Sequence, residues 1–279
     1  MKLSKQRIAA VAAGLVVTGG VATVVAQSAV PAGPNALAFP ADYDQGVKYA
    51  TLDRWDNKQV RDFWASAEVV AAAKAGKPIP EGAVLTLAAY AAKLDADGKP
   101  LLDANGRFIK DKLVAVNPMK KDKAAAAAIP ADIRNGDWIY QTFSADGKVN
   151  DKANLAACYQ CHLPFAQDDY LTNMAKLAGR FPSDAKPVAA GPNDVTITNW
   201  VFGPGAVKVT AGQPVTWVNH DDSPHQITIV GADGKQGQRS GVMLKGQKAT
   251  LQFDAAGNIA YICGLHPSMK GTIEVAARN

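Results

Sequence analysis

The chain has 279 residues, enough for two domains with their own hydrophobic cores. Its 30 basic and 25 acidic residues give a formal net charge of +5, and three of the basic residues lie within the first seven positions. Without those three the balance is 27 against 25, a net +2. With no basic aromatic stripe either, this composition argues against a nucleic-acid-binding protein.

The N-terminus has the pattern of a secretory signal peptide over residues 1–26. The three basic residues precede an apolar run that ends at Ala26, and no further charge follows until Asp42. Val24 and Ala26 stand three and one positions before a cleavage point at Gln27. An uncleaved membrane anchor is the alternative, but glycines and threonines make the run a weak span. We therefore expect a periplasmic protein.

The first domain is expected to follow an irregular, proline-rich lead-in over residues 27–45 and to cover residues 46–180. Apolar residues at helical spacing predict a helix from Asn57 to Ala75, with Gly76 just past its end. Residues 120–128 are polar and then all alanine, which is typical of a loop or a short helix.

Strands are predicted after that helix because β-favouring runs alternate with Asp-Gly and Asn-Gly turns. The expected strands are residues 83–92, 112–116 and 138–143, and the turns are Asp97-Gly98, Asn105-Gly106 and Asp146-Gly147. Residues 181–194 then have linker composition. Short strands separated by turn residues, including 215–219, predict a small β sandwich over residues 195–279.

Two cysteines followed by a histidine, Cys158-Tyr159-Gln160-Cys161-His162, have the spacing for covalent attachment of a c-type haem. The thiols add to the two vinyl groups of the porphyrin, and the adjacent imidazole becomes the axial ligand of the iron. A disulfide does not require His162, and a zinc site would need two further Cys or His ligands nearby. We therefore expect one haem c held by Cys158, Cys161 and His162.

The sixth iron position is not assigned by the sequence. No second histidine lies in this domain, so bis-histidine ligation within it is excluded. Met119 and Met174 are candidates, although methionines in such segments are more often core residues. We expect a five-coordinate iron that is open to a small molecule.

The region from Asp42 to Leu177 resembles the cytochrome P-460 family. The resemblance rests on four ordered segments, residues 78–85, 134–138, 158–162 and 169–171. It implies an α+β, mostly antiparallel-β haem domain, often dimeric, with an open distal site. The family includes enzymes that oxidise hydroxylamine and relatives, the cytochromes c-prime-beta, that bind nitric oxide. The enzymes carry a further bond from a lysine to the haem ring, for which the sequence offers Lys93, Lys110, Lys112 and Lys120.

The C-terminal segment carries the donor atoms of a blue-copper site. Cys263, His266 and Met269 stand three residues apart and supply a thiolate, an imidazole and a thioether. His225 follows the predicted strand 215–219 and is the remaining ligand. The last histidine, His220, is expected to be solvated. One type 1 copper therefore accounts for the third cysteine.

Residues 195–276 resemble the cupredoxins, most closely amicyanin and plastocyanin. The matching segments are 213–219, 240–246 and 253–261. The resemblance implies an all-β Greek-key sandwich. Gln226 departs from it, because many relatives have Asn or Thr after the first ligand histidine, and this change bears on hydrogen bonding behind the site.

Two functions stay open. In the first, a small nitrogen compound, either hydroxylamine or nitric oxide, is oxidised at the open iron. Copper then passes single electrons through the exposed edge of His266 to a soluble redox partner protein. In the second, the chain is a non-catalytic electron carrier or a nitric-oxide-binding cytochrome with a fused copper relay. Both involve electron transfer, and fusion raises the effective concentration of one centre at the other.

Overall fold

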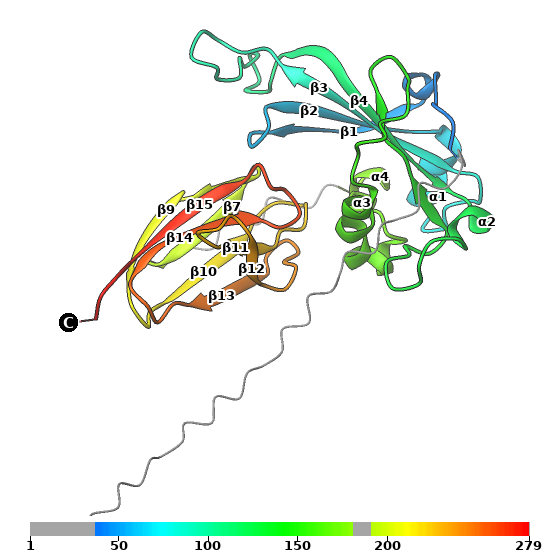
Figure 1. The fold of residues 1–279 in the computed structure, drawn as a ribbon. Coiled ribbons are helices and arrows are strands. Elements are labelled where there is room, and N and C mark those ends of the chain that lie inside the picture. Colours follow the sequence, from blue (N-terminus) through cyan, green and yellow to red (C-terminus); the bar gives the residue numbers. More distant parts are fainter. Residues whose placement is uncertain (1–36, 181–190, 279) are drawn as a thin grey trace, which may run out of the picture.

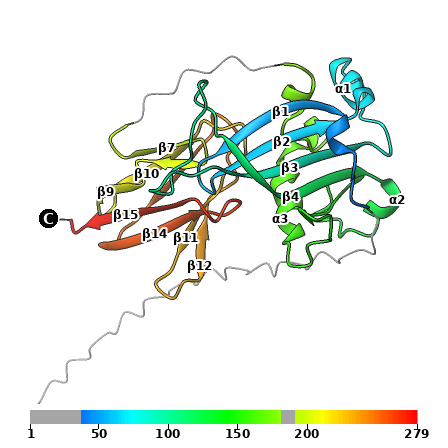
Figure 2. The same cartoon turned by 90° about the horizontal axis from the view of Figure 1, so that it is seen from above.

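The computed structural model describes residues 37–180 and 191–278. The predicted signal peptide, most of the lead-in and most of the linker lie outside these residues. The described residues form two neighbouring domains, an N-terminal sheet with helices against it and a C-terminal pair of sheets (Figures 1 and 2). This arrangement confirms the predicted fold classes. Within the described ranges, no helix is long and apolar enough to cross a membrane.

The N-terminal sheet is antiparallel throughout, with the order β1-β2-β3-β4-β5 and β6 paired to β4. Its strands are β1 (Val47–Arg54), β2 (Gln59–Ala65), β3 (Val84–Ala92), β4 (Lys110–Lys121), β5 (Trp138–Tyr140) and β6 (Phe143–Ser144). A short 3-10 helix, Tyr43–Gln45, precedes the first strand. Gly98, Gly106 and Gly147 have positive φ, as the predicted turns require.

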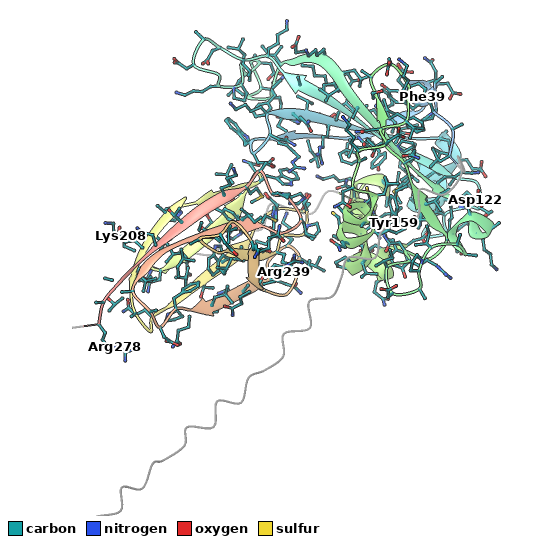
Figure 3. The ribbon with its side chains drawn as sticks, viewed as in Figure 1. Phe39, Asp122, Tyr159, Lys208, Arg239 and Arg278 are labelled. Atoms are coloured by element: carbon teal, nitrogen blue, oxygen red, sulfur yellow. The ribbon has the colours of Figure 1, made fainter. Side chains whose placement is uncertain are left out.

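Four short α-helices accompany this sheet (Figure 1): α1 (Ala67–Lys74), α2 (Lys123–Ala126), α3 (Leu155–His162) and α4 (Met174–Leu177). A 3-10 helix, Leu163–Asp168, continues directly from α3. The main core lies between the sheet and these helices and buries Trp138 and Tyr159. Figure 3 labels Tyr159 on α3. The haem-attachment motif therefore sits on a helix that is packed against the sheet.

The predicted helix from Asn57 to Ala75 is wrong in its first half. Residues 59–65 form β2, and only 67–74 are helical. Val60, Phe63 and Trp64 repeat at a spacing that suits a helix, but β2 pairs with β1 on one side and β3 on the other. The true start was marked by Ser66, whose hydroxyl caps the helix by accepting a hydrogen bond from the Val69 amide at 3.3 Å.

The C-terminal domain is a sandwich of two mixed sheets, ordered β13-β10-β7-β8 and β12-β11-β14-β15-β9. The strands are β7 (Asp194–Thr198), β8 (Val201–Gly203), β9 (Ala206–Thr210), β10 (Pro214–Asn219), β11 (Ile227–Val230), β12 (Gln236–Arg239), β13 (Lys248–Gln252), β14 (Gly257–Cys263) and β15 (Lys270–Ala276). One apolar core between the sheets contains Trp217 and Tyr261, whose rings meet edge to face.

Candidate metal centres

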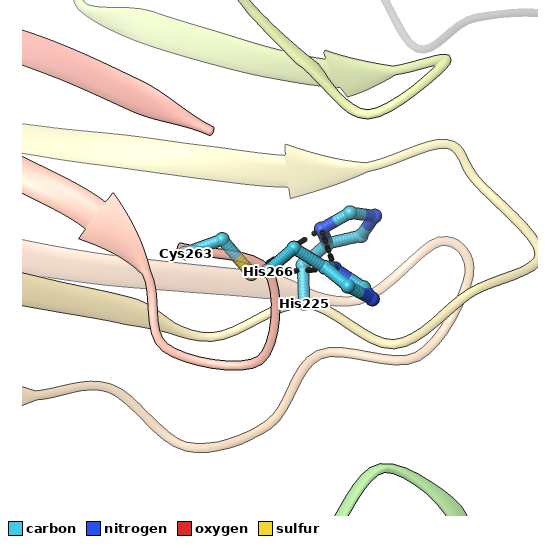
Figure 4. A group of neighbouring side chains, drawn as sticks. All are labelled: His225, Cys263 and His266. Carbon is cyan, nitrogen blue, oxygen red and sulfur yellow. Dashed lines mark hydrogen bonds between the residues drawn. The ribbon is translucent and has the colours of Figure 1, made fainter. Parts of the chain in front are cut away.

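The end of β14 and the loop before β15 bring three predicted copper ligands together (Figure 4). The Cys263 Sγ atom lies 3.5 Å from His225 Nδ1 and 3.6 Å from His266 Nδ1, and the two Nδ1 atoms are 3.4 Å apart. All three donors thus surround one point. A thiolate and two imidazole nitrogens are the equatorial donors of a blue-copper centre, so the residues present fit a single copper ion.

The fourth predicted ligand, Met269, closes the same loop. Its amide donates to the His266 carbonyl at 3.0 Å, and its carbonyl accepts from the Cys263 amide at 3.1 Å. The Met269 side chain is buried in the core cluster that contains Cys263. This tight loop fixes the spacing of the three C-terminal donors before any metal binds. His220 is half-buried and is not part of the cluster.

Asp221 is a functional residue that the sequence did not single out. Its buried carboxylate accepts a hydrogen bond from His225 Nε2 at 3.0 Å. It also accepts from the backbone amides of Asn199 at 2.6 Å and Trp200 at 2.8 Å. Because Nε2 carries the proton that it donates, Nδ1 of His225 is left free for the metal.

The two histidines of the cluster have opposite pKa shifts. Burial acts to lower the pKa of His225, but hydrogen bonds to Asp221 and Cys263 outweigh it, and the net pKa is raised. Burial, followed by the charges of Arg54 and His225, holds the pKa of His266 well below its usual range. His266 is therefore held as neutral imidazole, the form that binds metals.

Gly264, in the ligand loop, packs directly against Gln226. The Gly264 amide donates to the Gln226 carbonyl at 2.7 Å. A Cβ atom at Gly264 would lie 2.6 Å from both Gln226 Oε1 and Thr228 Oγ1, so a side chain there would collide with this wall. The departure at Gln226 is thus accommodated by a glycine that follows the copper cysteine.

The haem-attachment residues lie on one helical turn of α3. Cys158, Cys161 and His162 are all partly exposed and all line a cavity of about 310 Å³. The His162 Nδ1 atom lies 2.7 Å from the Tyr170 carbonyl, to which it donates a hydrogen bond. Burial lowers the pKa of His162 to about 4. The ring is therefore neutral, with Nε2 available as an iron ligand.

The backbone that presents the Tyr170 carbonyl is in a conformation rare for non-glycine residues. Asp169 and Tyr170 have φ of 51° and 59°. Neighbouring Gly136 also has a positive φ, and a Cβ there would approach the Tyr170 ring to 3.0 Å. Two segments of the family resemblance, 134–138 and 169–171, thus meet behind His162, the predicted axial ligand.

Asn135 and Tyr140 join α3 to the sheet. The Asn135 amide, fully buried, donates to the Tyr159 carbonyl at 3.1 Å and to the Tyr140 hydroxyl at 2.9 Å. The Tyr140 ring lies against both Tyr159 and His162, at centroid distances of 4.7 and 4.9 Å. These contacts position the ring of His162, the predicted haem ligand.

Comparison with known proteins divides the chain at the same place as the structure. A family model for the cytochrome P-460 proteins matches residues 40–172, and one for copper-binding proteins of the plastocyanin/azurin family matches residues 189–276. Amicyanin-alpha from Methylorubrum extorquens is 33% identical over 102 residues, which are 36% of this chain and 86% of that protein. Amicyanin from Paracoccus denitrificans is 32% identical over 43% of this chain and 92% of its own length.

The chain is a fusion of a cytochrome P-460 domain and a cupredoxin. Among solved structures, a purple cupredoxin from Nitrosopumilus maritimus is similar over 30% of this chain and 98% of its own, with 26% identity and a TM-score of 0.28. The two families imply a haem and a type 1 copper, and the donor sets described above fit both. With these two cofactors, the fusion is an electron-transfer protein.

The cavity of the P-460 domain has an apolar wall opposite the haem-binding helix. Phe63, Leu85 and Met119, from three adjacent strands, contribute to this wall. Met119 is therefore the candidate sixth ligand that faces the cavity, whereas Met174 packs into the main core and is not among the lining residues.

None of the four lysines considered for a haem cross-link lines this cavity. Lys93 and Lys112 are exposed on the sheet. The Lys110 ammonium group is paired with the buried carboxylate of Asp62, and Lys120 with Asp122 at 2.9 Å. Among the described lining residues there is also no aspartate or glutamate; the charged side chains are Arg54 and Arg61.

The cupredoxin closes one side of this cavity. His266 and Leu265 of its ligand loop line the cavity together with Cys161 and His162. His266 is half-buried at this cavity, and the expectation that its edge serves an outside protein stays a prediction. The edge of the copper-site imidazole faces the haem site of the same chain, a consequence of domain docking that no local sequence pattern encodes.

Proposed function

We propose that this fusion binds nitric oxide, or a similarly small uncharged ligand, at an open haem face and exchanges single electrons between its haem and its own copper. Cys158 and Cys161 attach the haem and His162 is its axial ligand. His225, Cys263, His266 and Met269 hold the copper. When bound, the haem supplies an iron that takes a small ligand, and the copper supplies a one-electron store.

The observation that carries this proposal is the chemistry of the described cavity lining. Oxidation of hydroxylamine releases protons together with electrons, and a positioned base must accept those protons. The lining offers no carboxylate and no lysine, and its cations at Arg54 and Arg61 do not accept protons. His162 has its Nδ1 committed to Tyr170. This favours ligand binding and electron transfer over hydroxylamine oxidation.

The cavity lining combines apolar side chains with hydrogen-bond donors. Phe63, Leu85 and Met119 give the lining apolar surface, and Arg61 and Asn117 on the same strands add hydrogen-bond donors. Burial raises the pKa of Tyr140 well above its ordinary value, so its hydroxyl stays protonated. A small ligand that needs no proton acceptor suits this lining.

The cellular location that we propose follows from the chemistry of haem attachment. Covalent haem attachment takes place outside the cytoplasm, and residues 1–26 have the signal-peptide pattern. We therefore place the mature protein in the periplasm, where a soluble redox partner protein supplies or removes electrons. A homodimer through the P-460 domain stays a prediction from the family resemblance.

Anaerobic titration of the reduced, haem- and copper-loaded protein with nitric oxide tests the proposal. We expect one equivalent to shift the main haem band, and hydroxylamine with excess electron acceptor to give no steady turnover. Cys263→Ser is the matched control, because it removes copper binding and leaves the haem face unchanged. Sustained hydroxylamine oxidation by the wild type would overturn the proposal in favour of an enzyme.

A further inference from the structure

The last residues of β1 reach across to the copper domain. Arg54 Nε donates to Asp56 Oδ1 at 2.9 Å, and both side chains of this ion pair are buried. The Arg54 guanidinium carbon lies 5.3 Å from the centre of the Trp200 ring, a cation–π contact with the cupredoxin. On the other side, the Ser268 hydroxyl of the copper loop donates to Asp56 Oδ2. One ion pair therefore contacts two separate segments of the cupredoxin.

Two further contacts surround the same opening. Leu52, also on β1, packs against the apolar core cluster of the cupredoxin. Beyond the cavity, Lys176 on α4 forms a salt bridge to Asp222 at 3.0 Å, with 17% of the lysine side chain exposed. Asp222 follows Asp221, which orients His225. The contacts therefore lie on both sides of the ligand loop.

The cation–π contact is connected to the copper cluster by a short backbone path. Trp200 and Asn199 both have positive φ, 58° and 54°, in the turn between β7 and β8. That conformation directs their two amides to the Asp221 carboxylate. Arg54 therefore packs on a turn whose amides hold the carboxylate that orients a copper ligand. Such a linkage gives the two domains one defined relative position.

We propose that Leu52, the Arg54–Asp56 pair and Lys176 form a docking clamp, which holds the copper loop on the haem cavity and makes this chain's own haem domain the electron-exchange partner of its copper. The proposal rests on the ligand sets of the proposed function. Within the clamp, His266 is the residue of the copper site that faces the haem site. While the domains are docked, the half-buried His266 lies at the haem site of its own chain.

The two ends of the clamp differ in their response to salt. The Arg54–Asp56 pair is buried, so dissolved ions screen it weakly. The Lys176–Asp222 pair is partly exposed and weakens as ionic strength rises. We therefore expect undocking to need loss of the Arg54 contacts, and salt to have only a modest effect on the wild type.

The first experiment is Arg54→Met in the haem- and copper-loaded protein, with Arg107→Met as the matched control. Arg107 pairs with Asp53 within the P-460 domain and does not line the cavity. Hydrogen exchange at the amides of residues 264–268 and the rate of electron redistribution after pulse reduction are measured. We expect exchange to rise and redistribution to slow by about tenfold in Arg54→Met, which corresponds to about 1.4 kcal/mol of docking free energy. The control is expected to match the wild type.

Arg54→Met leaves Asp56 buried without its partner, which is itself destabilising. The double variant Arg54→Met/Asp56→Asn removes that charge, and Lys176→Met tests the other end of the clamp at a half-buried position. Lys148→Met is the control for the lysine change, since Lys148 is paired only with nearby Asp146. Lys176→Met is expected to raise loop exchange about twofold at low salt and less at high salt.

The haem spectrum and the copper resonance of each variant are recorded first. Failure to bind either cofactor at the assigned residues contradicts the proposed function and not the clamp. With both cofactors in place, wild-type exchange and redistribution in the double variant and in Lys176→Met would overturn the clamp. Slower redistribution with increased exchange confined to the ligand loop would support it.

Discussion

The copper site and the haem site are built in opposite ways. The copper donors are assembled by one short loop and one distant histidine, and Cys263 and His225 are both fully buried. The haem donors lie along one helix, partly exposed, facing a cavity whose far wall comes from other strands. The copper site is therefore complete within its domain. The haem site acquires its chemical character from residues far away in the chain.

This difference divides what each cofactor can do. Cys263 has no access to solvent, so substrates cannot approach it, and the copper is restricted to electron transfer. The cavity beside the proposed haem residues is lined on one side by His266 of the copper loop. His266 of the proposed copper site and His162 of the proposed haem site thus line the same cavity.

The largest expected effect is complete loss of the blue copper band in Cys263→Ser, because the thiolate produces that absorption and a hydroxyl does not replace it. Visible absorption and copper resonance spectra measure this, with His220→Gln as the control that keeps its colour. Covalent haem content is expected to be unchanged. Loss of both cofactors would show that the two sites are not independently built.

The second effect is release of haem from the double variant Cys158→Ala/Cys161→Ala. Without the thioether bonds, only the axial bond of His162 and packing hold the porphyrin. Extraction of the denatured protein into acidic organic solvent is expected to remove all the haem, while the wild type keeps it. Retention in the variant would refute the assigned attachment residues.

A smaller effect is expected at Asp221, which orients the copper ligand His225 without touching the metal position. Asp221→Asn weakens the hydrogen bond to His225 Nε2, and loss of such a partner lowers metal affinity by about 10- to 100-fold. Competition with a chelator measures the change. Asp254→Asn, away from the copper cluster, is the control. Equal affinities in all three proteins would show that the loop alone positions the histidine.

The smallest effect is on folding. Asn135→Ala removes two hydrogen bonds and takes away the partner of the buried Tyr140 hydroxyl, while the Tyr159 carbonyl keeps its bond from the Leu163 amide. We expect the free energy of unfolding to fall by about 1–3 kcal/mol, measured by denaturant titration with haem bound. The exposed substitution Asn105→Ala serves as its control. A stability equal to wild type would mean that α3 is held by packing alone.

The sequence was most informative where function depends on closely spaced residues. The motif from Cys158 to His162 and the loop from Cys263 to Met269 each place several donors within a few positions, so their chemistry could be predicted without a fold. The turns at Gly98 and Gly106 were predictable for the same local reason.

The sequence was least informative where tertiary contacts decide. Residues 59–65 carry a helical spacing, but pairing with two neighbouring strands makes them β2. Asp221 is one more acidic residue in a loop until folding buries it against His225. The position of His266 at the haem cavity depends on contacts between residues more than two hundred positions apart, such as Asp56 and Ser268.

The measurement that tests the account most directly is an anaerobic visible spectrum of the haem- and copper-loaded protein, first oxidised and then fully reduced. With no described lysine in the cavity lining, we expect an ordinary ferrous c-type spectrum together with loss of the blue band on reduction. A ferrous haem band shifted far to the red would show a lysine–haem bond. That result would contradict the account and indicate an enzyme that oxidises hydroxylamine.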